Sequence, residues 1–353
     1  MTTSRQTTTA PPNVLTTSLA NLDPSLGLGV RPFGGLAEFG PMAAMSRLAN
    51  AHDDIPWLPT EENMRTEIDG ADGLDPATDI VLVHDDAGLA AFAGVQRVVR
   101  DGTPNYDAWG AVRPDLRRRG IGGALLDRNL GRIRARARLE DPGVPVIARS
   151  HVGETEAGHR SALEARGFTP DRHFFLMRRD DLGHLPAVVL PDGLEIRPVD
   201  PSTHRQIWEA ESEAFQDHWG SHTWTEHDFQ ATFSQSTIDT SLWAVAWDGD
   251  EVAGVVQGWI WTEENETFGV RRGWLEHVSV RRQWRRRGLA SALTISSMER
   301  FRDTGMTEAV LGVDSENPTG AMGLYERLGF VLFRRSAAYR LRLPAVPSTE
   351  AGR

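Results

Sequence analysis

The sequence predicts an α/β (α+β) chain of two tandem units, each with a mixed, mostly antiparallel sheet flanked by helices. Three observations support this fold class. Segments of strand type alternate with segments of helix type around a central hairpin in each half of the chain. An arginine-rich turn ending in glycine occurs twice, at Gly120 and Gly288, 168 positions apart. A Gly-Phe pair also ends a helical segment twice, at Phe168 and Phe330, 162 positions apart, and such similar offsets indicate an internal repeat.

Composition limits the function classes. A chain of 353 residues suits two domains, and a net charge of −11 argues against general nucleic-acid binding. The absence of cysteine excludes a disulfide framework, a cysteine-ligated zinc site and a cysteinyl acyl-enzyme. No apolar run approaches the ~20 residues that span a bilayer, and the N-terminus lacks the pattern of a signal peptide. We therefore expect a cytoplasmic protein without a membrane or nucleic-acid partner, whose oligomeric state the sequence does not indicate.

The first unit is predicted at 26–180, after a tail at 1–25 that is rich in Thr, Ser, Pro and Asn and is expected to be disordered. Apolar periodicity and turn residues predict its strands and helices. The expected strands are 28–33, 79–84, 89–95, 107–112 and 144–149, and the expected helices are 35–51, 61–69, 121–138 and 156–166.

The second unit is predicted at 194–345, after a linker at 181–193 that contains proline and glycine. Its first strand at 194–199 and its hairpin at 242–247 and 252–256 correspond to those of the first unit. A strand then leads to the second arginine-rich turn, followed by a helix at 289–304 and a strand at 309–313.

The second turn has the features of an anion site. Gly288 can adopt backbone angles that other residues resist, which lets successive N–H groups converge at the start of the following helix. The helix N-terminus carries partial positive charge, and three arginines lie beside it, which suits a pyrophosphate. A basic turn that merely caps a surface helix explains the same string equally well.

The residues after the turn help to decide between an anion site and a simple helix cap. The order strand, Arg-x-x-Gly-x-Ala, helix, strand, Asn and Leu-Tyr-x-x-Leu-Gly-Phe resembles the acetyl-coenzyme A core of the GNAT superfamily of N-acetyltransferases, over about 194–342. The tandem arrangement is similar to that of mycothiol synthase and its relatives.

The resemblance implies acetyl-CoA as acyl donor and no metal. In the second unit it places the coenzyme against Val278, Val280, Arg285, Arg286, Arg287, Gly288, Leu289, Ala290 and Asn317. The corresponding residues of the first unit are Val112, Arg117, Arg119, Gly120 and Gly122. For Asn317, a turn-forming role before Pro318 is the competing interpretation.

Acetyl transfer to an amine requires a neutral amine. An alkylammonium of pKa ~10.4 is neutral only about one part in ~10³ at pH 7, a cost of roughly 4–5 kcal/mol without a base. Period-two alternation predicts Glu276 on one strand face with Val278 and Val280, and His277 on the other face as a structural residue. The resemblance implies that Glu276 is the base, directly or through water. The competing interpretation is a carboxylate on a half-exposed strand.

Acetyl transfer also requires a proton for the leaving thiolate. A thiol of pKa ~8.5 and a phenol of pKa ~10 are a workable match. The resemblance assigns this role to Tyr325, the tyrosine of Leu-Tyr-x-x-Leu-Gly-Phe. Packing of the ring against the sheet is the competing interpretation.

At three positions, the first unit lacks the residues to which the resemblance assigns catalytic or coenzyme-binding roles in the second unit. Counting from its Gly-Phe pair and its turn places Leu163, Thr155 and Ala108 where the second unit has Tyr325, Asn317 and Glu276. Asp107 is adjacent but is expected to face the other way. We therefore expect a non-catalytic first unit kept for coenzyme binding or as a structural partner, and the sequence does not decide between these roles.

An aromatic and acidic segment follows the first helix of the second unit, where GNAT proteins shape the acceptor pocket. Trp219 and Trp224 are candidates to stack on a sugar or apolar chain, and Asp217 or Glu226 to attract a cation. Ordinary core and cap roles explain these residues equally well.

The resemblance implies an N-acyltransferase that moves an acetyl group from acetyl-CoA to a primary amine of a small molecule by direct attack in a ternary complex. One alternative acylates a peptide or protein amine, or uses a longer acyl donor. An alternative of another class is a non-catalytic acyl-CoA-binding regulatory module.

Overall fold

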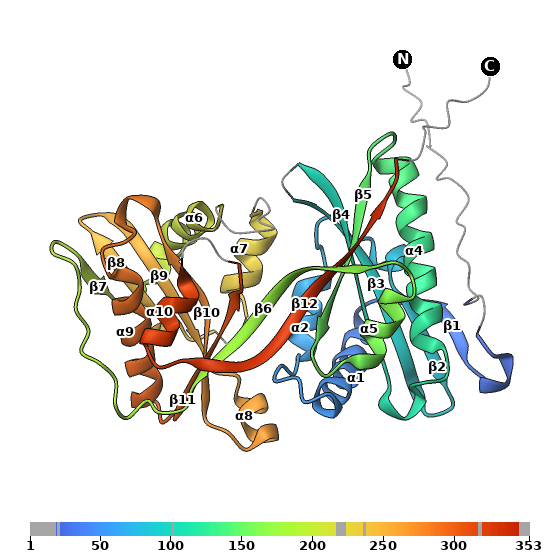
Figure 1. The fold of residues 1–353 in the computed structure, drawn as a ribbon, viewed down its shortest axis with the longest axis horizontal. Coiled ribbons are helices and arrows are strands. Elements are labelled where there is room, and N and C mark those ends of the chain that lie inside the picture. Colours follow the sequence, from blue (N-terminus) through green and yellow to red (C-terminus); the bar gives the residue numbers. More distant parts are fainter. Residues whose placement is uncertain are drawn as a thin grey trace, which may run out of the picture.

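One continuous sheet runs through the protein (Figure 1). The structure is a computed structural model that describes residues 19, 22–100, 102–216, 224–235, 238–316 and 320–345. Within these ranges the sheet has twelve strands in the order β1-β2-β3-β4-β5-β12-β6-β11-β10-β9-β8-β7.

The N-terminal half of the chain, up to residue 180, contributes six strands and five α-helices among the described residues. The strands are β1 (Gly29–Pro32), β2 (Val81–Asp85), β3 (Gly88–Arg100), β4 (Thr103–Val112), β5 (Val146–Gly153) and β6 (Thr169–Arg179). The helices are α1 (Phe39–His52), α2 (Glu61–Ile68), α3 (Pro76–Asp79), α4 (Ile121–Glu140) and α5 (Ala157–Glu164).

The C-terminal half, from residue 194, follows the same plan. Its strands are β7 (Glu195–Arg197), β8 (Ala244–Asp248), β9 (Glu251–Trp259), β10 (Arg272–Val280), β11 (Glu308–Asp314) and β12 (Val331–Leu343). Its helices are α6 (His204–Phe215), α7 (Glu226–Phe233), α8 (Thr262–Phe268), α9 (Leu289–Asp303) and α10 (Ala321–Arg327).

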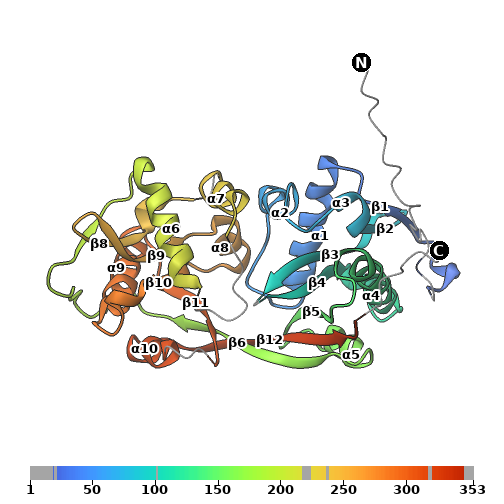
Figure 2. The same ribbon diagram turned by 90° about the horizontal axis from the view of Figure 1, so that it is seen from above.

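The strand pairing confirms the predicted fold class. Neighbouring strands are antiparallel except for the parallel pairs β4–β5 and β10–β11. The first five strands of each half lie in matching order, and helices cover both faces of the sheet (Figure 2).

The two halves exchange their last strands, which the sequence analysis did not predict. β6 belongs to the N-terminal half but pairs with β11, and β12 belongs to the C-terminal half but pairs with β5. The two exchanged strands also pair with each other, so they cross between the halves side by side (Figures 1 and 2). Units that are separate along the chain are therefore joined through their sheets.

The described part of the segment predicted as a tail, residues 19 and 22–25, is ordered. Leu19 is 6% exposed and packs in a core cluster with Val81 and Val83, and Pro24–Leu26 form a 3-10 turn. Burial of the Leu19 side chain offsets the cost of ordering this part of the chain. The predicted linker also contacts the protein, because Leu182 is 1% exposed in the C-terminal core.

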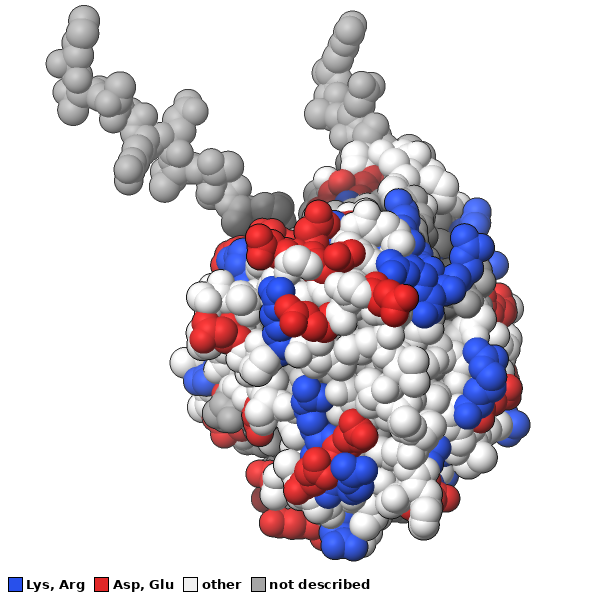
Figure 3. Space-filling model, turned by 90° about the vertical axis from the view of Figure 1, so that its left-hand side faces the viewer, with Lys and Arg blue, Asp and Glu red and all other residues white. Residues whose placement is uncertain are grey.

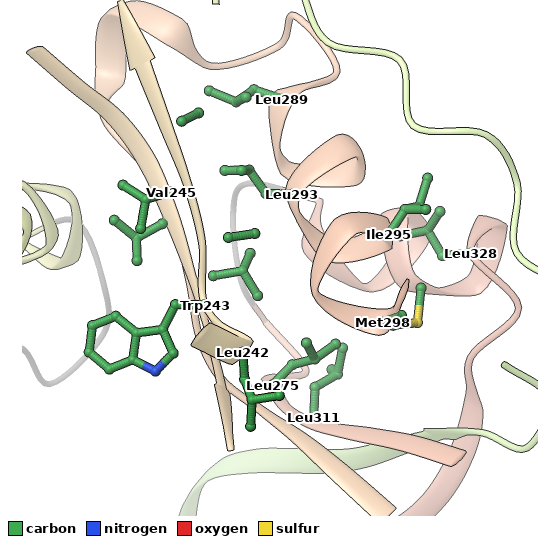
Figure 4. Close-up of a cluster of buried hydrophobic side chains, with 14 of the residues drawn as sticks. Leu242, Trp243, Val245, Leu275, Leu289, Leu293, Ile295, Met298, Leu311 and Leu328 are labelled. Atoms are coloured by element: carbon green, nitrogen blue, oxygen red, sulfur yellow. The ribbon is translucent and has the colours of Figure 1, made fainter. Parts of the chain in front are cut away.

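Close packing of α9 on the sheet fixes the start of this helix. Leu289, Leu293 and Met298 of α9 pack on one face of the sheet, and Trp243 lies on the other (Figure 4). Glycines make the close approach possible. A Cβ on Gly258 would lie 2.7 Å from Ser297 Oγ, which is closer than real Cβ contacts allow. The N-terminus of α9 is thereby held at the end of β10.

Charged side chains of both signs are interspersed on the end of the molecule formed by the C-terminal half (Figure 3). Among the described helices, none is both long enough and apolar enough to cross a bilayer.

Candidate active site

The two arginine-rich turns adopt the same backbone conformation. Arg286 and Gly288 have φ of 60° and 86°, and Arg118 and Gly120 have φ of 64° and 85°. A left-handed conformation at a non-glycine residue is unfavourable and often marks a functional site. No described side chain caps the N-terminus of α9 or of α4, so their first N–H groups are available to an anion.

One arginine in each turn stabilises the turn itself. Arg285 donates from Nε to Val280 O at 2.8 Å, and Arg117 donates from Nε to Val112 O at 3.2 Å. Arg117 also forms a bidentate ion pair with Asp53, at 2.5 and 2.8 Å. The predicted phosphate contacts of Arg285 and Arg117 therefore compete with bonds that these side chains already make.

The other residues predicted to bind the coenzyme phosphates differ in how far they are exposed to solvent. A Cβ on Gly288 would point into open space, with no described atom within 4 Å. The Leu289 side chain is 1% exposed, so only its backbone can reach a ligand. Arg286, Arg287, Gly288, Arg119 and Gly120 are exposed, and Ala290 and Gly122 are half-buried.

Beyond the turn, β10 and β11 part. Their parallel pairing ends at Leu275 and Leu311, although β10 continues to Val280 and β11 to Asp314. Backbone groups of β10 from residue 276 onward therefore lack a strand partner on this side, which suits an extended ligand with amide groups. The pantetheine arm of coenzyme A is such a ligand. On the neighbouring strand β11, a Cβ added at Gly312 would have no described atom within 4 Å.

A β-bulge lies where the two strands part. Leu275 pairs with Gly258 and His277 with Gln257, so Glu276 has no partner on β9. Gly258 and Leu275 face α9, and so does Val278 on the other side of the bulge. The predicted alternation is therefore wrong, because it assumed an uninterrupted strand. The bulge breaks the alternation that would place Glu276 on one face with Val278 and Val280, and the carboxylate interacts instead with His277 and Trp261.

Glu276 is exposed to solvent, but the protein around it displaces part of the water that would hydrate a carboxylate on an open surface. Removal of water by the surrounding protein raises the pKa of Glu276, against the opposing effects of His277 and the Trp261 indole. A carboxylate with a raised pKa is a stronger base, as proton abstraction from an amine requires.

Aromatic rings surround these two residues. Phe215 lies 5.6 Å from Trp224 and 4.9 Å from His277, and Trp259 lies 5.0 Å from Trp261, between ring centroids. We call Phe215, Trp224, Trp259, Trp261 and His277 the aromatic cluster. Of the predicted acceptor residues Trp224 belongs to it, whereas Asp217, Trp219 and the predicted coenzyme residue Asn317 lie outside the described residues.

Tyr325 lies on α10 and is 6% exposed, with its ring 6.0 Å from that of Phe330. Burial raises the pKa of Tyr325, so the hydroxyl keeps its proton at neutral pH. The structure gives the Tyr325 hydroxyl no hydrogen bond to a residue that it describes.

In the N-terminal half, the corresponding residues are buried or paired within the protein. β4 has no bulge, and Ala108 is buried in regular register opposite Val95. Ser150 Oγ donates to Ala108 O at 2.9 Å, just beyond the last β4–β5 pair. Leu163 is fully buried, and Asp107 is held by Arg100 at 2.5 and 2.9 Å.

The N-terminal half contacts α8 and the segment that follows α7. Asn63 of α2 donates to Gln235 Oε1 at 3.1 Å, and Arg47 of α1 pairs with Glu263 of α8. One turn beyond Asn63, the surrounding protein raises the pKa of Glu67 to about 7. Figure 2 shows α2 beside α7.

Sequence reasoning missed several of these residues. Glu211 and Gln257 contact His277 from other elements. Trp259 ends β9, the strand next to β10, and Trp261 directly precedes α8. The Trp-x-Trp string at the end of a predicted hairpin was the one signal available for the tryptophans. Over the described ranges, no group of three or more His, Asp or Glu residues is arranged to hold a metal ion.

Comparisons with known proteins identify similar chains. Residues 204–330 match the model of the acetyltransferase (GNAT) family. The mycothiol acetyltransferase of Thermobispora bispora is 31% identical over 264 residues, which cover 74% of this chain and 82% of that protein. The one from Kytococcus sedentarius is 32% identical over 271 residues, covering 74% and 86%.

Solved structures show the same fold. A GCN5-related N-acetyltransferase from Sphaerobacter thermophilus superposes with a TM-score of 0.67 at 26% identity, covering 91% of this chain and 97% of that one. A tandem GNAT protein from the clavulanic acid biosynthesis pathway has a TM-score of 0.63 at 17% identity, covering 91% and 99%, and supports the fold alone.

Proposed function

Because this chain belongs to the GNAT family of acetyltransferases, we propose that its C-terminal half transfers an acetyl group from acetyl-CoA to a primary amine of a small molecule. The observation that carries the proposal is the unpaired edge of β10. It joins an anion-binding turn at one end to a bulge with Glu276 and the aromatic cluster at the other.

The residues present suit acetyl-CoA, which would supply the acetyl group as a thioester. The N–H groups at the start of α9, with exposed Arg286 and Arg287, would hold the pyrophosphate. Backbone groups of Val278 and Val280 would pair with the pantetheine amides.

Glu276 would take the proton of the acceptor amine, directly or through water. The neutral amine nitrogen then forms a bond to the acetyl carbon while the carbon–sulfur bond breaks. The second proton that the nitrogen loses passes to another acceptor such as water, and Tyr325 would protonate the departing sulfur. Trp224 and the other rings would pack on the acceptor and favour its cationic form before transfer. No residue needs to become acylated.

The acceptor class rests on the relatives, whose printed name is mycothiol acetyltransferase and which therefore support a small-molecule amine. We place the reaction in the cytoplasm. We assign the catalytic unit to 194–345 and a non-catalytic unit to 26–180, joined by 181–193. The closed positions around Ala108 and Leu163 support this division.

The first test measures coenzyme binding. Calorimetric titration with acetyl-CoA should show binding to the wild type and its loss in Gly288→Val, because the added side chain would enter the open space in front of α9. Gly305→Val is the matched control. Gly305 has φ of 89° and open space around it, but it lies at the other end of α9. Equal affinity of Gly288→Val and Gly305→Val would contradict the coenzyme site.

The second test identifies the acceptor. Thiol release from acetyl-CoA is followed with a panel of amino sugars, S-protected cysteine amides and aromatic amines. Release that depends on one amine, with an acetylated product seen by mass spectrometry, would establish the reaction. A panel that also includes lysine peptides would separate a small-molecule acceptor from a protein acceptor.

A further inference from the structure

Glu211 is a charged residue buried below the aromatic cluster. It lies on α6 and is fully buried, and its Oε2 accepts a hydrogen bond from Gln257 Nε2 at 2.6 Å. Trp259 Nε1 donates to Gln257 Oε1 at 3.3 Å, which fixes the direction of the amide. Burying a carboxylate costs free energy unless a partner compensates its charge. The second oxygen of Glu211, Oε1, is not bound by Gln257.

That second oxygen faces His277. Glu211 Oε1 lies 3.5 Å from His277 Nδ1, and neither buried atom has another hydrogen-bond partner among the described residues. The imidazole side chain is 35% exposed. Because Nδ1 is buried against Glu211, Nε2 is the ring nitrogen left for a ligand. The ring therefore presents Nδ1 to a buried carboxylate, and the rings of Phe215 and Trp224 lie beside it.

The charges around the ring favour its protonated form. Burial lowers the pKa of His277, but Glu211 and then Glu276 outweigh this effect, so the net shift is upward. Glu211 acts from α6 and Glu276 from the bulge, while β9 contributes the neutral Gln257. When the imidazole is neutral, Glu211 favours the tautomer with the proton on Nδ1, which leaves the lone pair on Nε2.

We propose that His277 is a second proton acceptor of the acceptor site, positioned by Glu211, and that the proton lost by the amine comes to rest on His277 Nε2. This inference rests on the proposed acetyl transfer. In the step, an N–H bond of the amine breaks as the bond to the acetyl carbon forms, and the proton reaches Nε2 directly or by way of Glu276. The carbon–sulfur electron pair leaves with the thiolate, which Tyr325 protonates.

The proposal predicts a specific pH dependence. Only neutral His277 accepts the proton, so kcat/KM should rise with pH as His277 loses its own proton, at a pH above the ordinary histidine value of ~6.5. Glu211→Gln removes the negative charge and keeps the shape. It should move this rise to lower pH by about one to three units. Loss of a merely structural contact would lower the rate at every pH without moving the rise.

A measurement without substrate tests the pair itself. Protein labelled with ¹⁵N-histidine is titrated by NMR, and the His277 signal is identified as the one missing from His277→Gln. The His277 pKa should lie above 6.5 in the wild type, fall in Glu211→Gln and stay unchanged in Glu209→Gln. Glu209 is an exposed residue of the same helix and serves as the matched control. If Glu211→Gln does not fold, the wild type decides, because a His277 pKa at or below 6.5 would overturn the pair.

Turnover tests the catalytic role, with the most rapidly acetylated amine of the panel as the probe. The account expects the rise in kcat/KM to follow the NMR titration in the wild type and in Glu211→Gln, and to disappear in His277→Gln with a loss of at least about tenfold at pH 8. If the pH profile of turnover is the same in the wild type, Glu211→Gln and His277→Gln, the proposed role of His277 is wrong. The proposed acetyl transfer is not affected by that result. A panel on which no amine is acetylated counts against the proposed function, while the NMR result still decides the Glu211–His277 pair.

Discussion

Glu276 interrupts β10 at the point where the strand loses its partner β11. Glu276→Gln preserves the shape of the side chain and removes its basic lone pair. The rate at neutral pH should therefore fall. In this variant kcat/KM should keep rising toward the amine pKa of ~10, because high pH supplies the neutral amine that is no longer generated through Glu276.

The check is a pH profile of the wild type, Glu276→Gln and Glu266→Gln. Glu266 is an exposed carboxylate on the neighbouring helix α8, so its variant controls for the loss of one charge. A wild-type profile in Glu276→Gln would make this glutamate structural.

For single residues, the sequence named candidates but did not indicate the directions of their side chains. Glu276, Tyr325 and Trp224 were named from motif and order. The direction of Glu276 was wrong because period-two alternation holds only for an uninterrupted strand, and no local signal marks the bulge. Glu211 was missed because its partner His277 lies 66 positions away along the chain and meets it only through packing of α6 on β10.

The short helix α8 carries a buried acid that should make stability depend on pH. Glu264 is 2% exposed. It accepts a hydrogen bond from Trp274 Nε1 at 3.0 Å, while its Oε2 has no partner among the residues described. Burial raises its pKa to about 7, although Trp274 and Arg272 act in the opposite direction. The folded protein therefore favours the protonated carboxyl.

The sign of the effect follows from this shift. Below pH 4.5 both the folded and the unfolded states hold the proton. Between pH 4.5 and about 7 the unfolded state loses it first, so stability declines by up to roughly 3 kcal/mol. Glu264→Gln should remove this part of the decline, as measured by urea unfolding at pH 4.5, 6 and 8. An unchanged difference between the two proteins at all three values would refute the shift.

Elements were predictable where local chemistry marks them. The glycines at 120 and 288 predicted the two turns, and both glycines have positive φ in the structure. Apolar periodicity predicted α4 and α9. The exchange of β6 and β12 was not predictable, because either strand offers the same pattern to either sheet. Which strand pairs with which is decided by long-range packing.

For the whole molecule, the exchanged strands predict that the halves stay together without a continuous chain. A protease site introduced at Val189, which is 74% exposed, allows the chain to be cut between the halves. The cut protein should elute as one species in size-exclusion chromatography and separate only in denaturant, because β12 remains paired with β5 and β6 with β11. Two separate species in native buffer would be incompatible with the exchange.

The central claim is that two similar folds share one chain and only the C-terminal one performs chemistry. It is tested most directly by turnover of Tyr325→Phe beside Asp107→Asn, with the acetyl-CoA affinity of each variant measured in parallel. The account predicts that Tyr325→Phe loses about 10²- to 10⁴-fold in turnover with little change in affinity. Asp107→Asn should stay near the wild type, since Asp107 pairs with Arg100. Loss of turnover in Asp107→Asn with normal turnover in Tyr325→Phe would contradict the account.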